Sequence, residues 1–143
     1  MEKRHPLTGL YFGSAYFAEA EVFLREAKEK QYCMVAMDIE HFRLFNQIHG
    51  EKAGNHLLMV ISDMLLEYKE NHESILGYLG ADDFAFVTEY DKDALAKLRQ
   101  KIREEIRERI KTSGYPPAYG IYVIEDREEP VINMYNHATV ALS

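Results

Sequence analysis

Apolar positions recur with two different periods along the chain, and the change of period predicts its elements. Apolar residues spaced three and four apart predict helices, whereas short apolar runs rich in branched and aromatic residues predict strands. The predicted helices cover residues 14–30, 41–48 and 52–69, a stretch after residue 91, and a last stretch from residue 131. The predicted strands cover residues 31–40, 74–79, 84–90 and 118–125. Crossover helices and one hairpin between these strands predict an α/β fold, with a mixed central sheet and helices on both faces.

Apolar stripes identify the buried faces of three predicted helices. The stripes are Ala15, Phe17, Ala18, Val22, Phe23 and Ala27 in helix 14–30, Leu57, Leu58, Ile61, Leu65 and Tyr68 in helix 52–69, and Leu95, Leu98, Ile102, Ile106 and Ile110 in the helix after residue 91. Ser14 is the expected N-cap of the first of these helices, and Asp91 or Asp93 that of the third. Gly114 is the expected end of the third.

A β-hairpin with adjacent carboxylates at its tip is expected between Ser74 and Tyr90, with residues 80–83 as its turn. The apolar strand that precedes the hairpin in the sequence ends with acidic residues, the first of which is Asp38. If the strands are neighbours in one sheet, Asp38, Asp82 and Asp83 meet at one edge, as in many sites for divalent metals and phosphates. Without further information, an ordinary polar hairpin tip is the simpler explanation of the two aspartates.

Composition narrows the class of protein. A chain of 143 residues with 47% hydrophobic residues is long enough for a real core, and we expect an N-terminal arm over 1–13 and a single domain over 14–143. The net charge of −7 argues against binding to nucleic acid or to anionic lipid. The single cysteine, Cys33, lies in an apolar run and is expected to be a core residue in a reducing, cytoplasmic compartment. No apolar run is long enough to span a bilayer.

The chain resembles the GGDEF domains of diguanylate cyclases over almost its whole length. The matching segments are Pro6–Leu10, Asp38–Phe42 followed by Asn46, Gly50 and Gly54, then Gly80–Phe84 at the family's signature, Tyr119–Ile121, and Ala138. The resemblance and the order of the elements both indicate a palm-like, nucleotidyl cyclase-like fold. In the family, two domains with one GTP each and Mg²⁺ form cyclic di-GMP and pyrophosphate.

The resemblance implies a role for each site residue. Asp38 and Asp82 would be metal carboxylates with the Ile39 carbonyl as a further ligand, and Asp83 would be the acid nearest the reacting hydroxyl group. The implied nucleotide site consists of Phe42, Arg43, Asn46, Asn55, Gly80 and Ala81. Arg43 would lie near the phosphates, and the two asparagines would lie at the guanine. Capping of helix ends explains the asparagines equally well.

The chain departs from the family where the nucleotide would bind. Ala81 replaces a glycine at a turn that favours positive φ, which costs an alanine about 1 kcal/mol. Asp83 replaces a longer glutamate, and Asn55 replaces an aspartate that accepts two guanine protons. Tyr78 stands where arginine is usual and is interpreted as a cross-strand aromatic residue. Further departures are His5, Phe12, Gly13, Gln47 and Thr139, and the Arg-x-x-Asp of the product site is absent from residues 71–74.

These departures favour a degenerate GGDEF domain of bacterial cyclic di-GMP signalling, catalytically inactive and acting as a nucleotide-sensing, regulatory or dimerising module. The alternatives are an active diguanylate cyclase and a ligand-free scaffold. The expected ligands are a weakly held Mg²⁺ and GTP or a related purine nucleotide. The expected partners are a second copy of the domain or adjoining signalling domains, because the domain is expected to be part of a larger protein.

Overall fold

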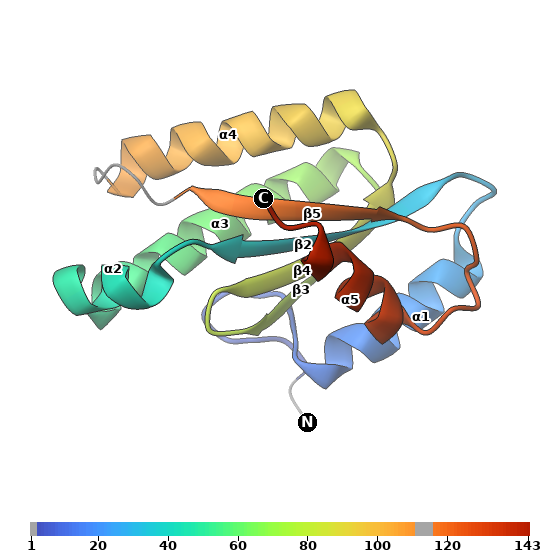
Figure 1. Cartoon of the computed structure of the whole chain (residues 1–143), viewed down its shortest axis with the longest axis horizontal. Helices are drawn as coiled ribbons and strands as arrows, with labels where there is room; N and C mark the ends of the chain where they lie inside the picture. Colours follow the sequence, from blue (N-terminus) through green and yellow to red (C-terminus); the bar gives the residue numbers. More distant parts are fainter. Residues whose placement is uncertain (1–2, 111–115) are drawn as a thin grey trace.

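A mixed five-stranded sheet with the strand order β1-β3-β4-β2-β5 organises the computed structural model, which describes residues 3–110 and 116–143. The strands are β1 (Tyr11–Phe12), β2 (Tyr32–Ile39), β3 (Ser74–Gly80), β4 (Asp83–Glu89) and β5 (Pro117–Val123). The helices are α1 (Ser14–Glu26), α2 (Phe42–His49), α3 (Glu51–Asn71), α4 (Lys92–Ile110) and α5 (Val131–Val140) (Figure 1). The β1–β3 pair is parallel, and the other strand pairs are antiparallel. The predicted α/β fold with a hairpin is therefore confirmed.

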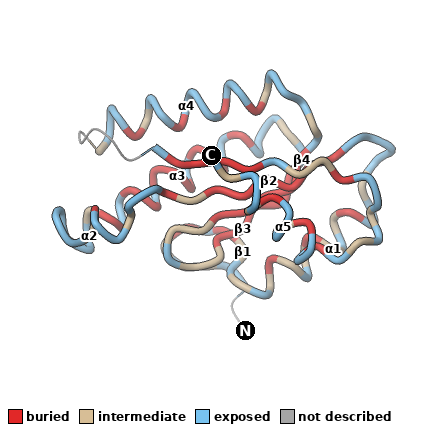
Figure 2. Tube along the Cα trace, viewed as in Figure 1, coloured by how far each residue is buried: buried red, intermediate tan, exposed pale blue. Residues whose placement is uncertain are grey.

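Helices cover both faces of the sheet. On one face, side chains of α3 and α4 pack against Cys33, Val35 and Met37 of β2. On the other face, α1 and α5 pack against Met34 and Ala36 of the same strand. Figure 2 shows the resulting buried layer along the central strands. Cys33 is a buried free thiol, as expected, and burial raises its pKa to about 12.

The apolar stripes predicted for α3 and α4 are confirmed. The stripe residues of α3 are buried, as are those of α4 except Ile110, which packs partly buried against the same core. Asp91 caps α4: its Oδ1 accepts hydrogen bonds from the backbone N–H groups of Asp93 and Ala94, both at 3.1 Å. The predicted end at Gly114 lies outside the described residues.

The predicted buried face of α1 is confirmed only in part: Phe17, Phe23 and Ala27 pack partly buried against the core, but the fully buried stripe consists of other residues. Tyr16, Ala20 and Leu24 form its buried stripe, while Ala18 and Val22 are exposed. Apolar residues occur on several sides of this helix, so their spacing does not single out one face. Tyr16 carries a polar hydroxyl group, yet it is fully buried because that group donates to the Ile75 carbonyl oxygen at 3.3 Å.

Both predicted ends of α1 are also corrected. Gly13, not Ser14, occupies the N-cap position, and no side chain caps the helix there. The helix ends at Glu26 rather than at residue 30. The Arg127 guanidinium group donates to the carbonyl oxygens of Ala27 and Lys30, both at 2.9 Å. These bonds satisfy carbonyl groups that follow the end of the helix, where the chain has no intrahelical partner for them.

The N-terminal arm contributes a strand that the sequence did not reveal. Tyr11 and Phe12 form β1 and pair with Gly77 and Tyr78 at one edge of the sheet. Leu10, just before them, is fully buried in the core of the α3–α4 face. Two residues are too few to show a strand period, which explains the omission.

Among the described residues, no helix is long and apolar enough to cross a membrane.

Candidate functional site

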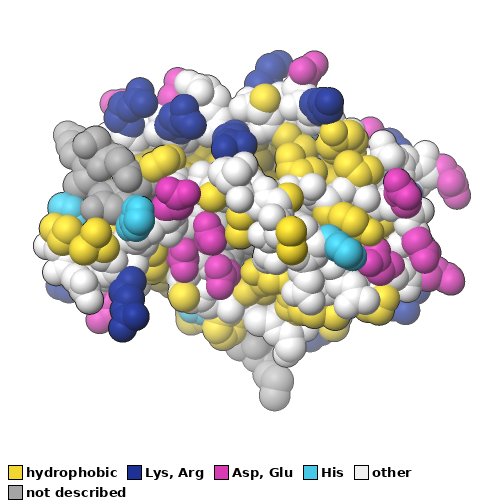
Figure 3. Space-filling view, viewed as in Figure 1, with side chains coloured by type: hydrophobic (Ala, Val, Ile, Leu, Met, Phe, Trp, Pro, Cys, Tyr) yellow, Lys and Arg dark blue, Asp and Glu magenta, His cyan; other side chains and the backbone are white. Residues whose placement is uncertain are grey.

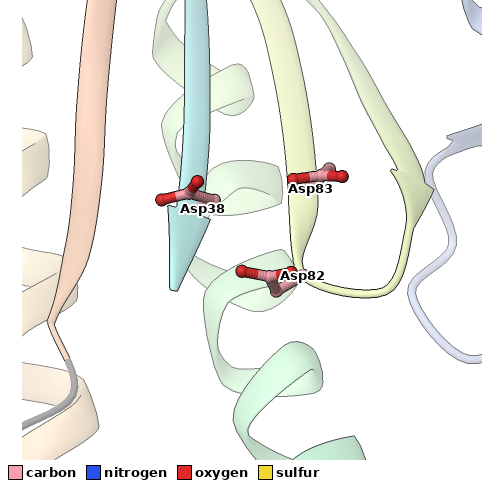
Figure 4. Close-up of side chains that lie close together, drawn as sticks. All are labelled: Asp38, Asp82 and Asp83. Atoms are coloured by element: carbon pink, nitrogen blue, oxygen red, sulfur yellow. The ribbon is translucent and has the colours of Figure 1, made fainter. Parts of the chain in front are cut away.

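Three carboxylates meet at one end of the two central strands. The register pairs Met37 with Phe84, so the next residue on β2, Asp38, lies beside the preceding residue on β4, Asp83. Asp82 joins them from the hairpin turn. Each offers an oxygen atom that lies within 4.8 Å of the others (Figure 4). The convergence predicted from the sequence is therefore present.

Asp82 ties the hairpin tip to the end of β2. Its Oδ2 accepts a hydrogen bond from the backbone N–H of Ile39 at 2.9 Å. The bond fixes the orientation of this carboxylate relative to Asp38, the neighbour of Ile39 on the strand. The acidic residue of the turn is thus held by the backbone of another strand.

Burial and the crowding of negative charge raise the affinity of the site for protons. Burial, together with the nearby charges of Asp82 and Asp38, raises the pKa of Asp83 to about 6. Burial also raises the pKa of Asp38, with additional contributions from Asp82 and Glu40. Carboxylate oxygens are the ligands that Mg²⁺ prefers, and a divalent cation relieves such repulsion. The three side chains therefore fit a hard divalent cation.

The turn itself has the conformation expected of a glycine pair. Gly80 has φ of 106°, and Ala81 has φ of 50°, in the left-handed region. The predicted positive φ at position 81 is confirmed, and the backbone of this alanine is therefore strained. The hydroxyl group of Tyr78 donates a hydrogen bond to the Ala81 carbonyl oxygen at 2.7 Å, which holds the turn in this conformation.

Tyr78 belongs to an aromatic cluster that joins the arm to the hairpin. Its ring centroid lies 5.2 Å from that of Phe84, its cross-strand partner, so the interpretation of Tyr78 is confirmed. His5 and Phe12 of the arm complete the cluster, at 4.7 Å and 5.9 Å from Tyr78. One signal for this contact is visible in the sequence, because His5, Phe12 and Tyr78 all replace polar residues that are usual in the family.

The residues expected at the base lie on α2 and α3. Asn46 is half-buried, and its Oδ1 is buried without a hydrogen-bond partner among the described residues. Gly54 makes room for it, because a Cβ there would lie 1.8 Å from this oxygen. Asn55 and Arg43 are exposed, and Phe42 is half-buried. The capping alternative is not supported, because neither α2 nor α3 has a side-chain cap hydrogen bond at its N-terminus.

Tyr135 on α5 is a neighbour of the carboxylates that the sequence did not indicate. Burial, together with the negative charges of Asp83, Asp38 and Asp82, raises its pKa to about 12. Its ring also contacts Phe17 of α1 at 5.9 Å between centroids. The helix that carries it is far from the other site residues in sequence, so only the fold brings it near.

The segment at the position of the family's product site is occupied by internal packing. The His72 ring stacks on that of Tyr68, with centroids 4.2 Å apart. Lys69 donates to the Ser74 carbonyl oxygen at 2.5 Å. The segment carries no arginine, so it lacks the guanidinium fork that binds phosphate and guanine in two places at once.

A palm-like sheet whose hairpin tip adds carboxylates to a central strand defines a domain of the nucleotidyl cyclase class. The sequence profile of the family described as "Diguanylate cyclase, GGDEF domain" matches residues 3–143. The chain belongs to the GGDEF domain family, and it is a domain of cyclic di-GMP signalling.

Similar proteins agree with this assignment. DgcT of Escherichia coli K12, named as a probable diguanylate cyclase, is 28% identical over 119 residues, which are 82% of this chain and 25% of DgcT. An uncharacterised protein of Streptomyces ambofaciens is 30% identical over 82 residues, which are 57% of this chain and 43% of that protein. The chain thus spans less than half the length of the curated relatives it matches.

Solved structures show the same fold. The GGDEF domain of DgcB from Caulobacter crescentus, crystallised with cyclic di-GMP, has a TM-score of 0.79 at 20% identity, over 99% of this chain and 88% of that chain. The FimX GGDEF domain from Pseudomonas aeruginosa has a TM-score of 0.77 at 15% identity, over 99% and 91% of the two chains.

Proposed function

We propose that the chain is a degenerate, catalytically silent GGDEF domain that binds a purine nucleotide weakly, with a divalent cation, and acts as a sensing, regulatory or dimerising module. The observation that carries the proposal is the pairing of a complete carboxylate cluster with Ala81 at positive φ beside it. The cluster keeps the means to hold a cation. The turn has lost the open glycine that lets a phosphate approach the backbone.

Asp38 and Asp82, with the Ile39 carbonyl, would hold the cation. A bound Mg²⁺ supplies positive charge that neutralises the phosphate oxygens of a nucleotide. The Ile39 N–H keeps Asp82 oriented, so little ordering of this side chain is needed on binding. We therefore expect binding to depend on the metal.

Catalysis is expected to fail because phosphoryl transfer relies on positioning. The Ala81 methyl group is exposed on the turn, where it adds bulk beside the nucleotide. Asp83 has a carboxylate one methylene closer to the backbone than a glutamate would. A displacement of about 1 Å lowers such rates by about 10²-fold. Since the reaction joins two nucleotide-bound domains, each defect lowers the rate through both of them.

The base contacts are expected to be weak and only partly selective. The free Oδ1 acceptor of Asn46 is available to a donor group of a purine. Asn55 presents one acceptor and two donor protons, whereas an aspartate presents only acceptors. An asparagine matches the donor–acceptor edge of adenine. We therefore expect a reduced preference for GTP over ATP.

An active cyclase is the second candidate, and the intact cluster of Asp38, Asp82 and Asp83 is the observation that favours it. A ligand-free scaffold is less favoured for the same reason. Contact with adjoining domains is proposed because the match covers only 25% of DgcT. A dimer is proposed because the family's reaction joins two nucleotide-bound domains. Light scattering of the purified chain with and without nucleotide tests self-association.

Isothermal titration with GTP and ATP tests the proposal. We expect weak binding with Mg²⁺ that is lost in EDTA and in Asp38→Ala. Glu40→Gln is the matched control, because it removes a neighbouring exposed charge without removing a cluster ligand. Binding that is unchanged by EDTA and by Asp38→Ala would contradict the metal dependence. A strong preference for GTP in competition would contradict the relaxed base selectivity.

A further inference from the structure

A cavity of about 250 Å³ lies between the beginning of α4 and the edge strand β5. Its lining includes Val35, Phe86, Tyr90, Leu95, Leu98 and Tyr119. Figure 3 shows hydrophobic side chains gathered below the beginning of α4, with Lys and Arg side chains beside them. Val35 and Phe86 belong to the core on the α3–α4 face. The cavity is therefore on the opposite face of the sheet from Asp38.

A buried hydroxyl group in this cavity has no partner. Tyr119 is 8% exposed, and its Oη makes no hydrogen bond to any of the described residues. A buried donor left unsatisfied destabilises a fold, so such groups nearly always have a partner. The hydroxyl group of Tyr119 is thus available to an acceptor that enters the cavity.

Positive charge borders the cavity in an otherwise acidic chain. The guanidinium carbon of Arg99 lies 4.6 Å from the centre of the Tyr119 ring, and its Nη2 donates to the Ser143 carbonyl oxygen at 3.1 Å. Lys92 also lines the cavity. Within residues 3–110 and 116–143, neither cation forms an ion pair. Both cations can therefore attract an anion to the cavity.

We propose that this cavity binds a small carboxylate with a planar apolar body. The body would pack among the rings of Phe86 and Tyr90 and the side chains of Leu95 and Leu98. The carboxylate would accept the Tyr119 hydroxyl proton and lie near Arg99. The apolar interior, the free donor and the nearby cation each match one part of such a molecule. A neutral ligand could use the donor but would gain nothing from the charge of Arg99, and a cationic ligand would be repelled by it.

The volume sets the size of the ligand. A cavity of about 250 Å³ holds roughly ten non-hydrogen atoms, since a water molecule takes about 30 Å³ of liquid. Phenylacetate has that size and chemistry and is a suitable probe. A ligand of about ten atoms reaches a dissociation constant on the order of 1 mM at ordinary efficiency.

The test is a titration of the full chain with phenylacetate, followed by amide chemical shifts. We expect saturable shifts around Leu95 and Ile121, and binding weakened about 10-fold in Tyr119→Phe and in Arg99→Gln. The neutral analogue 2-phenylethanol should bind about 10-fold more weakly. Lys97→Gln is the matched control, because it removes a positive charge from the same helix but does not line the cavity.

Thermal melting establishes that each variant is folded. Asp38→Ala should bind phenylacetate like the wild type, so failure of the nucleotide proposal would leave this one standing. The proposal is wrong if no saturable shifts appear near the cavity, or if Tyr119→Phe binds as well as Lys97→Gln. Equal binding of phenylacetate and 2-phenylethanol would show an unselective apolar groove and overturn it as well.

Discussion

The hydroxyl group of Tyr78 donates a hydrogen bond to the Ala81 carbonyl oxygen at 2.7 Å, joining the last regular part of β3 to the strained residue of the turn. Tyr78 is 5% exposed and packs against Phe84 across the hairpin. The turn that presents Asp82 and Asp83 is therefore supported from the core side by an aromatic residue outside the carboxylate cluster.

Removal of this hydroxyl group should destabilise the domain. We expect Tyr78→Phe to lower the free energy of unfolding by about 0.5–1.5 kcal/mol, the ordinary contribution of such a bond. Urea unfolding provides the measurement. Tyr90→Phe is the control, because the Tyr90 hydroxyl group has no hydrogen-bond partner in the described part of the chain. Equal effects of the two substitutions would show that the Tyr78 bond contributes nothing.

Relief of the strain at position 81 should instead stabilise the domain. Ala81→Gly is expected to raise the free energy of unfolding by about 0.5–1 kcal/mol, because glycine adopts φ of +50° without steric penalty. Ala96→Gly, on the exposed side of α4, should instead lower it by about 1 kcal/mol. A loss of stability in Ala81→Gly would mean that the turn is not strained.

The crowded carboxylates predict a pH dependence of stability in the metal-free domain. The pKa of Asp83 is about 6 in the fold and 3.8 ordinarily, so the folded state binds this proton more tightly than the unfolded chain. The contribution of Asp83 to stability is full below about pH 4 and is lost as the pH rises through about 6. Asp83→Asn should therefore gain stability relative to the wild type across this interval.

Urea unfolding in EDTA from about pH 4 to pH 7 measures this difference. The difference between Asp83→Asn and the wild type should grow with pH. A difference that is constant over this range would show that burial and the neighbouring charges do not raise the pKa of Asp83 in the fold.

Cyclic di-GMP is not expected to bind at residues 71–74. His72 is stacked on Tyr68, and no guanidinium fork is present in that segment. Isothermal titration with cyclic di-GMP should show no submicromolar site. Tight binding that is lost in His72→Ala and Glu73→Ala would prove this prediction wrong.

The sequence predicted those features that depend on strong local patterns. The apolar stripe of α4 could be recognised from the sequence because charged residues separate Leu95, Leu98 and Ile102. The convergence of Asp38 with the hairpin acids followed from an apolar strand that ends at an acidic residue and a hairpin with two aspartates at its tip.

Features that depend on contacts between distant segments were missed. The strand β1 consists of two residues, and His5 meets Tyr78 only through the folded sheet. Arg127 donates to carbonyl groups just after the end of α1, about a hundred residues earlier in the chain. No local period in the sequence reports such contacts, because they depend on the tertiary structure.

The most direct test of the central proposal is the formation of cyclic di-GMP from GTP and Mg²⁺ at high protein concentration, followed by chromatography. The account predicts no detectable product from the wild-type chain. A triple variant, Ala81→Gly, Asp83→Glu and Asn55→Asp, restores the family's residues and is expected to regain product formation. Robust turnover by the wild type that is abolished in Asp82→Ala would contradict the account and show that the domain is an active cyclase.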